Sequence, residues 1–429
     1  MKKRRLQIHP VVGALLMGIA GLTALPSTWA CTRLVFLGAN GQVVTARSMD
    51  WKSDIVSNLW VLPRGMERSG KAGPNSLRWT SKYGSVITSG YDVSTTDGVN
   101  EAGLNANLLW LVESQYPAFG AGSKPGLTIA AWAQYVLDNF ATVQEAVAAL
   151  EKEPFTIVSD NVPGENRLTT LHLSMSDASG DSAIVEYING RQVIHHGRQY
   201  QVMTNSPTFD QQLALNTYWQ QVGGTTMLPG TNRAADRFAR ASFYVNAIPK
   251  SQDPNKALAS VFSVIRNASV PYGLNTPEEP NISSTRWRTV FDHQRKLYFF
   301  ESALTPNTFW IDLKALDFSQ KTGKVLKLDL GQTRTTPSRR CHAAVSGIST
   351  VSISRHLGKR KNATRNTKST TAAGGPQLCT VPAGITTMTV TVIGAGGATE
   401  GPVRAGLGTD RSSSCKPRPS GAPKRKIIW

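Results

Sequence analysis

The sequence predicts an α+β fold in which antiparallel β-sheets are covered by helices. Three observations lead to this class. Strand-like stretches follow one another closely enough to pair along the chain, helix-like stretches lie between groups of them, and 40% of the residues are hydrophobic, enough for a packed core. Strands paired in sequence with helices between them favour antiparallel sheets with helices on their outer faces.

Eight stretches are predicted to be strands because they are rich in apolar and β-branched residues. They are residues 31–37, 42–47, 84–89, 168–174, 182–188, 191–196, 288–292 and 296–301. The first two flank Gly38-Ala39-Asn40-Gly41, whose Asn-Gly pair is a hairpin signal. A hairpin at this position would return residues 47–50 to the neighbourhood of residue 31.

Four stretches are predicted to be helices, namely residues 127–139, 142–150, 234–247 and 254–267. Leu127–Asn139 has an apolar face at helical spacing. Thr142 and Glu145 form a capping box at the start of the next helix.

The net charge of +19 lies at the two ends of the chain. Residues 1–30 hold four basic residues and no acid, and residues 333–429 hold 16 basic and 2 acidic residues. The body, residues 31–332, keeps 27 basic and 26 acidic residues and is nearly neutral. The charge therefore says little about the substrate, and nucleic-acid binding is not predicted.

The basic tail, residues 333–429, is rich in Arg, Lys, Ser, Thr, Gly and Pro and is predicted to be largely disordered. Residues 386–396 alternate like a strand and are the exception. The charge of the tail would suit weak binding to anionic surfaces, but an extension without function is the favoured interpretation.

Residues 1–30 are predicted to be a secretory signal peptide. A basic start precedes an apolar run from Val11 to Leu25, which is too short for a membrane span of about 20 residues. Small residues at Thr28 and Ala30 predict cleavage after Ala30. Trp29 does not suit a lipoprotein signal, so we expect export to the periplasm or the medium without a stable membrane anchor.

Cleavage after Ala30 would make Cys31 the first residue of the mature chain. Its α-amine, with a pKa near 8, could take the thiol proton, and the thiolate is the nucleophile. A buried cysteine without a role is the alternative. Cys341, Cys379 and Cys415 lack the paired spacing of a zinc site. With no His-Glu-x-x-His motif either, no metal and no cofactor are expected.

The body resembles the choloylglycine hydrolase family, which includes conjugated bile acid hydrolases and penicillin V acylases and belongs to the N-terminal nucleophile (Ntn) hydrolases. The resemblance spans roughly residues 31–330 and rests on the order of five blocks. They are CTRLVFLGANGQVVTARSMDW from Cys31, DGVNEAGL at 97–104, TNSPTFD at 204–210, LPG and ADRF at 228–230 and 235–238, and WRTVFDHQRKLYFFES at 287–302.

The resemblance implies a four-layer αββα sandwich, with two antiparallel sheets face to face, helices outside, and the active site where Cys31 opens a central strand. It implies that Cys31 is the nucleophile. It also implies that Arg47 favours the thiolate and that Asp50 accepts a hydrogen bond from the Cys31 amine and orients it. A surface Arg–Asp pair is the alternative for the last two residues. Family members commonly form homotetramers, so a homotetramer is possible here.

Three further positions follow from the resemblance. Asn205 would donate to the oxyanion of the tetrahedral intermediate together with the backbone N–H of Trp110, and Arg237 would stabilise charge in the site. Turn formation is the alternative for Asn205, and a structural salt bridge for Arg237. Bile acid hydrolases carry an asparagine where Trp110 stands. Tryptophan is similar to the Gram-negative branch with penicillin V and acyl-homoserine lactone acylases, which favours an apolar or aromatic acyl chain.

The leading hypothesis is an exported amidase that cleaves penicillin V or an N-acyl-homoserine lactone, small-molecule acyl amides, through a thioester. The close alternative is a conjugated bile acid hydrolase. A non-catalytic protein that binds surfaces through the basic tail is the alternative from another class.

Overall fold

The computed structural model describes residues 30–120, 122, 124–277, 282–305, 307–319 and 325–330. The predicted signal segment up to residue 29, the basic tail 333–429 and its strand-like stretch 386–396 lie outside the described residues. Within the described part of the chain, no helix combines the length and the apolar character that crossing a bilayer requires.

Two large antiparallel sheets form from the described residues. The six-stranded sheet has the order β14 (Val202–Met203), β1 (Thr32–Leu37), β2 (Val43–Trp51), β15 (Ser284–Asp292), β16 (Leu297–Ser302) and β17 (Thr308–Asp312). The eight-stranded sheet has the order β13 (Arg191–His196), β12 (Ser182–Ile188), β11 (Leu171–Ser176), β8 (Asn105–Trp110), β7 (Ser94–Asn100), β6 (Ser85–Gly90), β3 (Leu59–Leu62) and β18 (Leu326–Leu328). Two small ribbons complete the strands, namely β9 (Gly126–Thr128) with β10 (Thr156–Val158) and β4 (Glu67–Ser69) with β5 (Arg78–Thr80).

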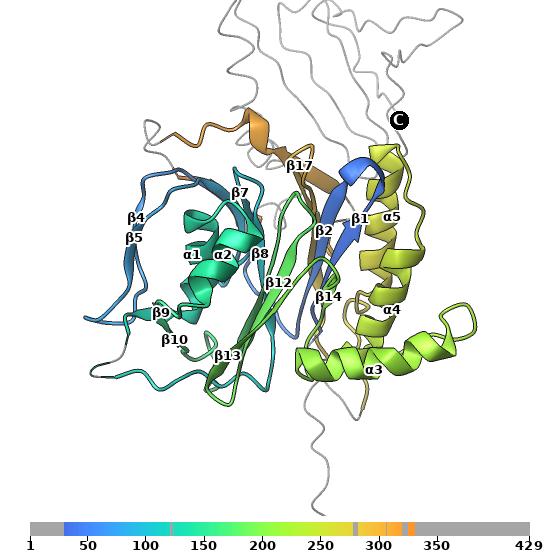
Figure 1. The fold of residues 1–429 in the computed structure, drawn as a ribbon, viewed down its shortest axis with the longest axis horizontal. Coiled ribbons are helices and arrows are strands. Elements are labelled where there is room, and N and C mark those ends of the chain that lie inside the picture. Colours follow the sequence, from blue (N-terminus) through green and yellow to red (C-terminus); the bar gives the residue numbers. More distant parts are fainter. Residues whose placement is uncertain are drawn as a thin grey trace, which may run out of the picture. The chain divides into compact units, whose positions relative to one another are not determined.

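Helices cover the outer faces of both sheets, as Figure 1 shows. The helices are α1 (Trp132–Asn139), α2 (Val143–Leu150), α3 (Phe209–Val222), α4 (Ala234–Ala247) and α5 (Pro254–Asn267). α1 packs on β7 and β8 and α2 on β12, whereas α4 and α5 pack on β1 and β2. This arrangement confirms the predicted αββα sandwich.

The first hairpin has the geometry that its Asn-Gly signal predicts. Asn40 (φ 53°) and Gly41 (φ 74°) adopt left-handed backbone, and β1 and β2 pair with Arg33 opposite Arg47. Left-handed backbone favours Gly, which has no β-carbon to be strained there, and Asn, whose short polar side chain can hydrogen-bond locally. β2 continues beyond the predicted end at residue 47 to Trp51, where it pairs with β15.

Three further predicted boundaries are wrong, each because pairing with a distant segment overrides the local pattern. The helix expected at 127–139 begins at Trp132, since Gly126–Thr128 forms a parallel ribbon with β10. β15 starts at Ser284 rather than at residue 288, because it pairs with the extended end of β2. The strand expected at 168–174 covers Leu171–Ser176, which pairs with β8 and β12. α3 was not predicted, because few of its side chains are buried and its sequence lacks a clear apolar stripe.

Apolar side chains gather in two clusters. One lies between the sheets and under α4 and α5, and it includes Cys31. The other lies under α1 and α2 and is centred on the fully buried Trp132. The first cluster therefore surrounds the start of β1, which holds the predicted nucleophile in a water-poor environment.

Candidate active site

Cys31 lies immediately before β1 and is buried, with only 4% of its surface exposed. Its Sγ atom is 3.7 Å from the backbone oxygen of Asp50 and 4.0 Å from Sδ of Met49. In this chain Ala30 precedes it, so its nitrogen is a peptide N–H, and this N–H donates to Oδ1 of Asn205 at 2.5 Å. Cys31 is thus in contact with two of the predicted site residues.

Arg237 reaches the same point from α4. Its Nη1 donates to the carbonyl oxygen of Cys31 at 2.5 Å and to the hydroxyl of Thr32 at 2.7 Å, and its Nη2 donates to Oδ1 of Asn205 at 2.9 Å. Burial lowers the pKa of Arg237 to about 10, which still leaves the guanidinium charged at neutral pH. Arg237 therefore fixes the start of β1 against Asn205.

The contacts of Asn205 fix the orientation of its side-chain amide. Two N–H donors, from Cys31 and Arg237, face Oδ1, so the other end must carry the NH₂ group. That Nδ2 donates to the backbone oxygen of Trp110 at 2.7 Å. The two residues expected to serve the oxyanion are therefore adjacent. That they donate hydrogen bonds to an oxyanion stays a prediction. In the structure, Nδ2 of Asn205 donates to the backbone oxygen of Trp110.

A buried pair of side chains, His172 and Glu186, holds the backbone on both sides of Asn205 and was not predicted from the sequence. His172 bonds to the backbone oxygen of Thr204 at 2.9 Å and to Glu186 at 2.9 Å, and Glu186 also accepts from the N–H of Phe209. His172 and Glu186 lie on neighbouring strands, β11 and β12. No motif marks them, because their role depends on tertiary contacts with backbone groups.

Asp50 is fully buried near the end of β2. Its Oδ1 accepts from the hydroxyl of Thr285, and its Oδ2 accepts from Ser48 at 3.3 Å. The Thr285 oxygen accepts from the N–H of Val270 at 2.9 Å, so its single proton is directed to Asp50. The predicted bond from Asp50 to a free Cys31 amine concerns the cleaved chain and stays a prediction.

Burial raises the pKa of Asp50 to about 6, against the opposing charge of Arg237 and the hydrogen bond from Thr285. A carboxylate with this pKa is ionised at neutral pH and becomes protonated under mildly acidic conditions. Burial also raises the pKa of the Cys31 thiol, and the charge of Arg47 is the largest effect that opposes this rise. The site thus depends on buried positive charge to keep its acidic groups ionisable.

Arg47 is buried as well, so the alternative of a surface pair with Asp50 does not hold. Its Nη2 donates to the backbone oxygen of Leu108 at 3.0 Å, and its guanidinium carbon lies 4.6 Å from the centre of the Trp287 ring. Among the described residues, its Nε and Nη1 have no hydrogen-bond partner. A buried cation with unused donors is well suited to stabilise negative charge that develops nearby.

Two tryptophans, which we call the aromatic wall, pack together in the apolar cluster that also contains Cys31. Trp51 at the end of β2 and Trp110 at the end of β8 lie 5.5 Å apart between ring centres, and both belong to the apolar cluster that contains Cys31. The guanidinium of Arg167 stacks 4.5 Å above the Trp110 ring. Trp51 was not predicted as a site residue, although it directly follows the Arg-x-x-Asp segment.

Comparison with known proteins places this geometry in a family. Residues 31–326 match the model described as linear amide C–N hydrolases, choloylglycine hydrolase family. The chain belongs to this family. It is 60% identical over 327 residues to a penicillin V acylase of Pectobacterium atrosepticum, a match that covers 72% of this chain and 87% of the relative.

Solved structures show the same relationship. A penicillin V acylase from Agrobacterium tumefaciens shares 75% identity with this choloylglycine hydrolase family member, with a TM-score of 0.65 and coverage of 70% of this chain and 92% of that one. A mutant conjugated bile acid hydrolase from Clostridium perfringens shares 25% identity, with a TM-score of 0.58 and coverage of 67% and 94%.

These findings confirm the predicted family and the enzyme class. The protein is a hydrolase that acts on carbon–nitrogen bonds of linear amides. Within the described residues, no group of three or more His, Cys, Asp and Glu side chains is arranged to hold a metal ion. The non-catalytic alternative acts through residues 333–429, which lie outside the described part of the chain.

Removing the hydroxyl of Thr285 tests the role of Asp50. Because the carboxylate loses a hydrogen bond that favours its charged form, Thr285→Val should raise the pKa of Asp50 by about one unit. If activity requires ionised Asp50, the acidic limb of the plot of kcat/KM against pH should shift from near pH 6 to higher pH by the same amount. The matched control is Thr80→Val, which removes the hydroxyl that donates to the exposed Glu67 carboxylate. An unmoved acidic limb in Thr285→Val would contradict the assignment.

Proposed function

We propose that the mature chain begins at Cys31 and is an exported N-terminal-cysteine amidase for penicillin V or N-acyl-homoserine lactones. One observation carries the proposal. The nitrogen, carbonyl oxygen and sulfur of Cys31 are each next to a different predicted site residue, namely Asn205, Arg237 and the backbone of Asp50. Convergence on a single cysteine that could become the N-terminus favours nucleophilic catalysis.

Cleavage of the Ala30–Cys31 bond would activate the site. The peptide N–H that now donates to Asn205 would become an amine with a pKa near 8 in water. The contact with Asn205 would hold this amine close to its own thiol. A neutral amine at this position can accept the thiol proton, which a peptide nitrogen cannot do.

The reaction would proceed in two displacements. The amine of Cys31 takes the thiol proton, and the thiolate attacks the amide carbonyl to form a tetrahedral oxyanion. The oxyanion accepts hydrogen bonds from Asn205 and from the Trp110 N–H. The ammonium then returns its proton to the leaving amine, and a thioester remains. Water, deprotonated by the same amine, hydrolyses the thioester and releases the acid.

Buried arginines would supply the electrostatic support. Burial disfavours the thiolate, and the charges of Arg47 and, to a smaller extent, Arg237 oppose this effect. Nε and Nη1 of Arg47 are buried and have no hydrogen-bond partner among the described residues, so both could donate to a new negative charge. Negative charge that forms at the sulfur or at the oxyanion would therefore be stabilised without reorganisation of water.

The aromatic wall supports the choice of acyl group. The tilted rings of Trp51 and Trp110 pack together, and the Trp110 backbone is joined to Cys31 through Asn205, so an aryl or alkyl acyl chain bound at Cys31 could pack against these rings. The penicillin V acylase relatives of higher identity agree with this preference. A conjugated bile acid hydrolase, the alternative, is supported by the relative of 25% identity.

Replacement of Cys31 tests the nucleophile. Cys31→Ser should lower kcat by more than about 100-fold, or about 2.7 kcal/mol of activation free energy, because a hydroxyl is a poorer nucleophile at neutral pH. Cys31→Ala should abolish turnover and keep the fold, as checked by circular dichroism and thermal unfolding. Turnover by Cys31→Ala at the wild-type rate would exclude Cys31 as nucleophile.

The N-terminus of the active enzyme tests the activation step. Mass spectrometry of exported, active protein should show Cys31 as the first residue and an unmodified amine. A variant that blocks cleavage, Ala30→Arg, should accumulate as an inactive chain because its Cys31 nitrogen stays in a peptide bond. Full activity in a chain that still carries residues 1–30 would disprove the mechanism.

A substrate panel separates the two amidase hypotheses. We expect kcat/KM for penicillin V or an acyl-homoserine lactone to exceed that for glycine- and taurine-conjugated bile acids by at least about tenfold, or about 1.4 kcal/mol. Trp110→Asn should reduce this preference, since the aromatic wall loses one ring. Faster hydrolysis of bile acid conjugates by the unmodified enzyme would favour the alternative.

A further inference from the structure

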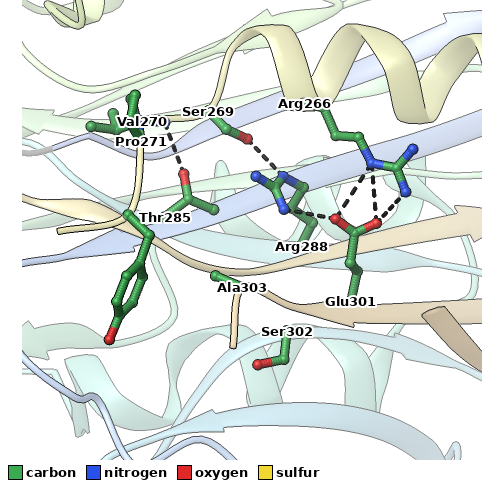
Figure 2. A pocket seen from close by; sticks show the side chains of 10 residues that line it. Arg266, Ser269, Val270, Pro271, Thr285, Arg288, Glu301, Ser302 and Ala303 are labelled. Carbon is green, nitrogen blue, oxygen red and sulfur yellow. Dashed lines mark hydrogen bonds and ion pairs between the residues drawn. The ribbon is translucent and has the colours of Figure 1, made fainter. Parts of the chain in front are cut away.

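A polar cavity of about 310 Å³ lies on the helix side of the six-stranded sheet. We name it the α5 cavity, because it lies at the end of α5, between the segment that follows this helix and strands β15 and β16 (Figure 2). Its polar lining includes Arg266, Ser269, Tyr272, Thr285, Arg288 and Glu301. Its size is at the lower end of small-molecule sites.

Two arginines in the cavity share one carboxylate. Arg288 donates to Glu301 at 2.7 Å, and Nε of Arg266 donates to the same side chain at 3.2 Å. Burial alone would raise the pKa of Glu301, but the hydrogen bonds and charges of both arginines outweigh it and lower this pKa. Glu301 is therefore ionised at neutral pH, and the group keeps one excess positive charge.

The excess charge is accessible to a ligand. Arg288 uses Nε for Ser269 and Nη1 for Glu301, and its third nitrogen, which points away from Glu301 in Figure 2, has no hydrogen-bond partner among the described residues. Val270, Pro271 and Ala303 provide apolar lining in the same cavity. A free guanidinium nitrogen beside apolar surface is typical of a site for an organic anion rather than for a bare ion.

A single hydrogen bond links the lining of the α5 cavity to Asp50. Thr285 forms part of the cavity wall, and its hydroxyl donates to Oδ1 of Asp50. Arg288 also acts on Asp50, because its positive charge lowers the pKa of this carboxyl. A bound anion would therefore contact two groups that keep Asp50 ionised, on the side of β2 opposite to Arg47.

We propose that the α5 cavity binds a small carboxylate with an apolar body, the class of acid that the amidase releases, and that occupancy slows turnover through the effect of Arg288 on Asp50. The identity of the bound acid rests on the proposed function, whereas the existence of the site does not. Occupancy would then inhibit the enzyme by its own product, from a cavity whose lining does not include Cys31.

The direction of the effect follows from the charges around Asp50. Asp50 is influenced by the charges of Arg237 on α4, Arg288 on β15 and Arg47 on its own strand, and it interacts electrostatically with Cys31, next to β1. A carboxylate on Arg288 offsets one of the three positive charges, so the pKa of Asp50 rises by about one unit. From a starting value of about 6, inhibition of kcat should be about fivefold at pH 6 and small at pH 8.

Inhibition kinetics with phenoxyacetate test the proposal. Acid that enters the acyl pocket raises KM alone, whereas acid in the α5 cavity lowers kcat at saturating penicillin V. We expect the kcat effect at pH 6, and we expect the neutral analogue phenoxyacetamide to lack it. Ala303→Trp should fill the cavity, keep kcat without added acid, and remove the kcat effect. An increase in KM alone for the unmodified enzyme would overturn the proposal.

A binding experiment tests the site without measuring turnover and without requiring Ala303→Trp to fold. Cys31→Ala protein, titrated with phenoxyacetate by calorimetry, should bind it, and adding Arg266→Gln should weaken this binding by about tenfold. Adding Arg64→Gln is the matched control, because Arg64 pairs with Glu101 at similar exposure, 51% against 49% for Arg266. Equal affinity in both double variants would reject the site. A failed amidase hypothesis would instead show as no hydrolysis without added acid.

Discussion

The site depends on the oxygen of one amide, Oδ1 of Asn205. It accepts from the N–H of Cys31 and from Arg237, and so it joins three segments that are far apart in the sequence. The positive charge of Arg237 is buried, and a buried charge is tolerated only where its donors are satisfied. Its other nitrogens bond to the Cys31 carbonyl and to the Asn232 carbonyl, which satisfies this condition. The position of Cys31 and the stability of the buried cation are therefore set by the same contacts.

Much of this arrangement could be predicted from the sequence, for identifiable reasons. The Asn-Gly hairpin brings Arg47 and Asp50 back towards Cys31 by local rules that act within 20 residues of chain. Asn205 and Arg237 could be found only through the order of family blocks, because no local rule brings either residue to Cys31. Helices α4 and α5 have the predicted bounds, since each has an apolar stripe that is buried on the sheet.

The parts that could not be predicted depend on tertiary contacts. Thr285 binds Asp50 only because β2 runs four residues further than its apolar pattern indicates, to a partner strand 235 residues away. His172 and Glu186 act on a backbone carbonyl and a backbone N–H, which carry no sequence signature. Trp51 and Trp110 become neighbours only when the two sheets face each other. Propensity and periodicity do not register contacts of this kind.

The alternation of side chains along β2 explains why Arg47 and Asp50 lie on opposite faces of this strand. Successive side chains of a strand point to opposite faces. Arg47 reaches Leu108 of the other sheet, and Trp51, on the same face, reaches Trp110, so this face looks between the sheets. Asp50 lies on the other face, where Thr285 and the charges of α4 and β15 meet it. Arg47 and the two tryptophans therefore share one side of β2, whereas Asp50 is contacted from the other. A carboxylate in the α5 cavity, as proposed, would act on Asp50 from the side opposite to Arg47, Trp51 and Trp110.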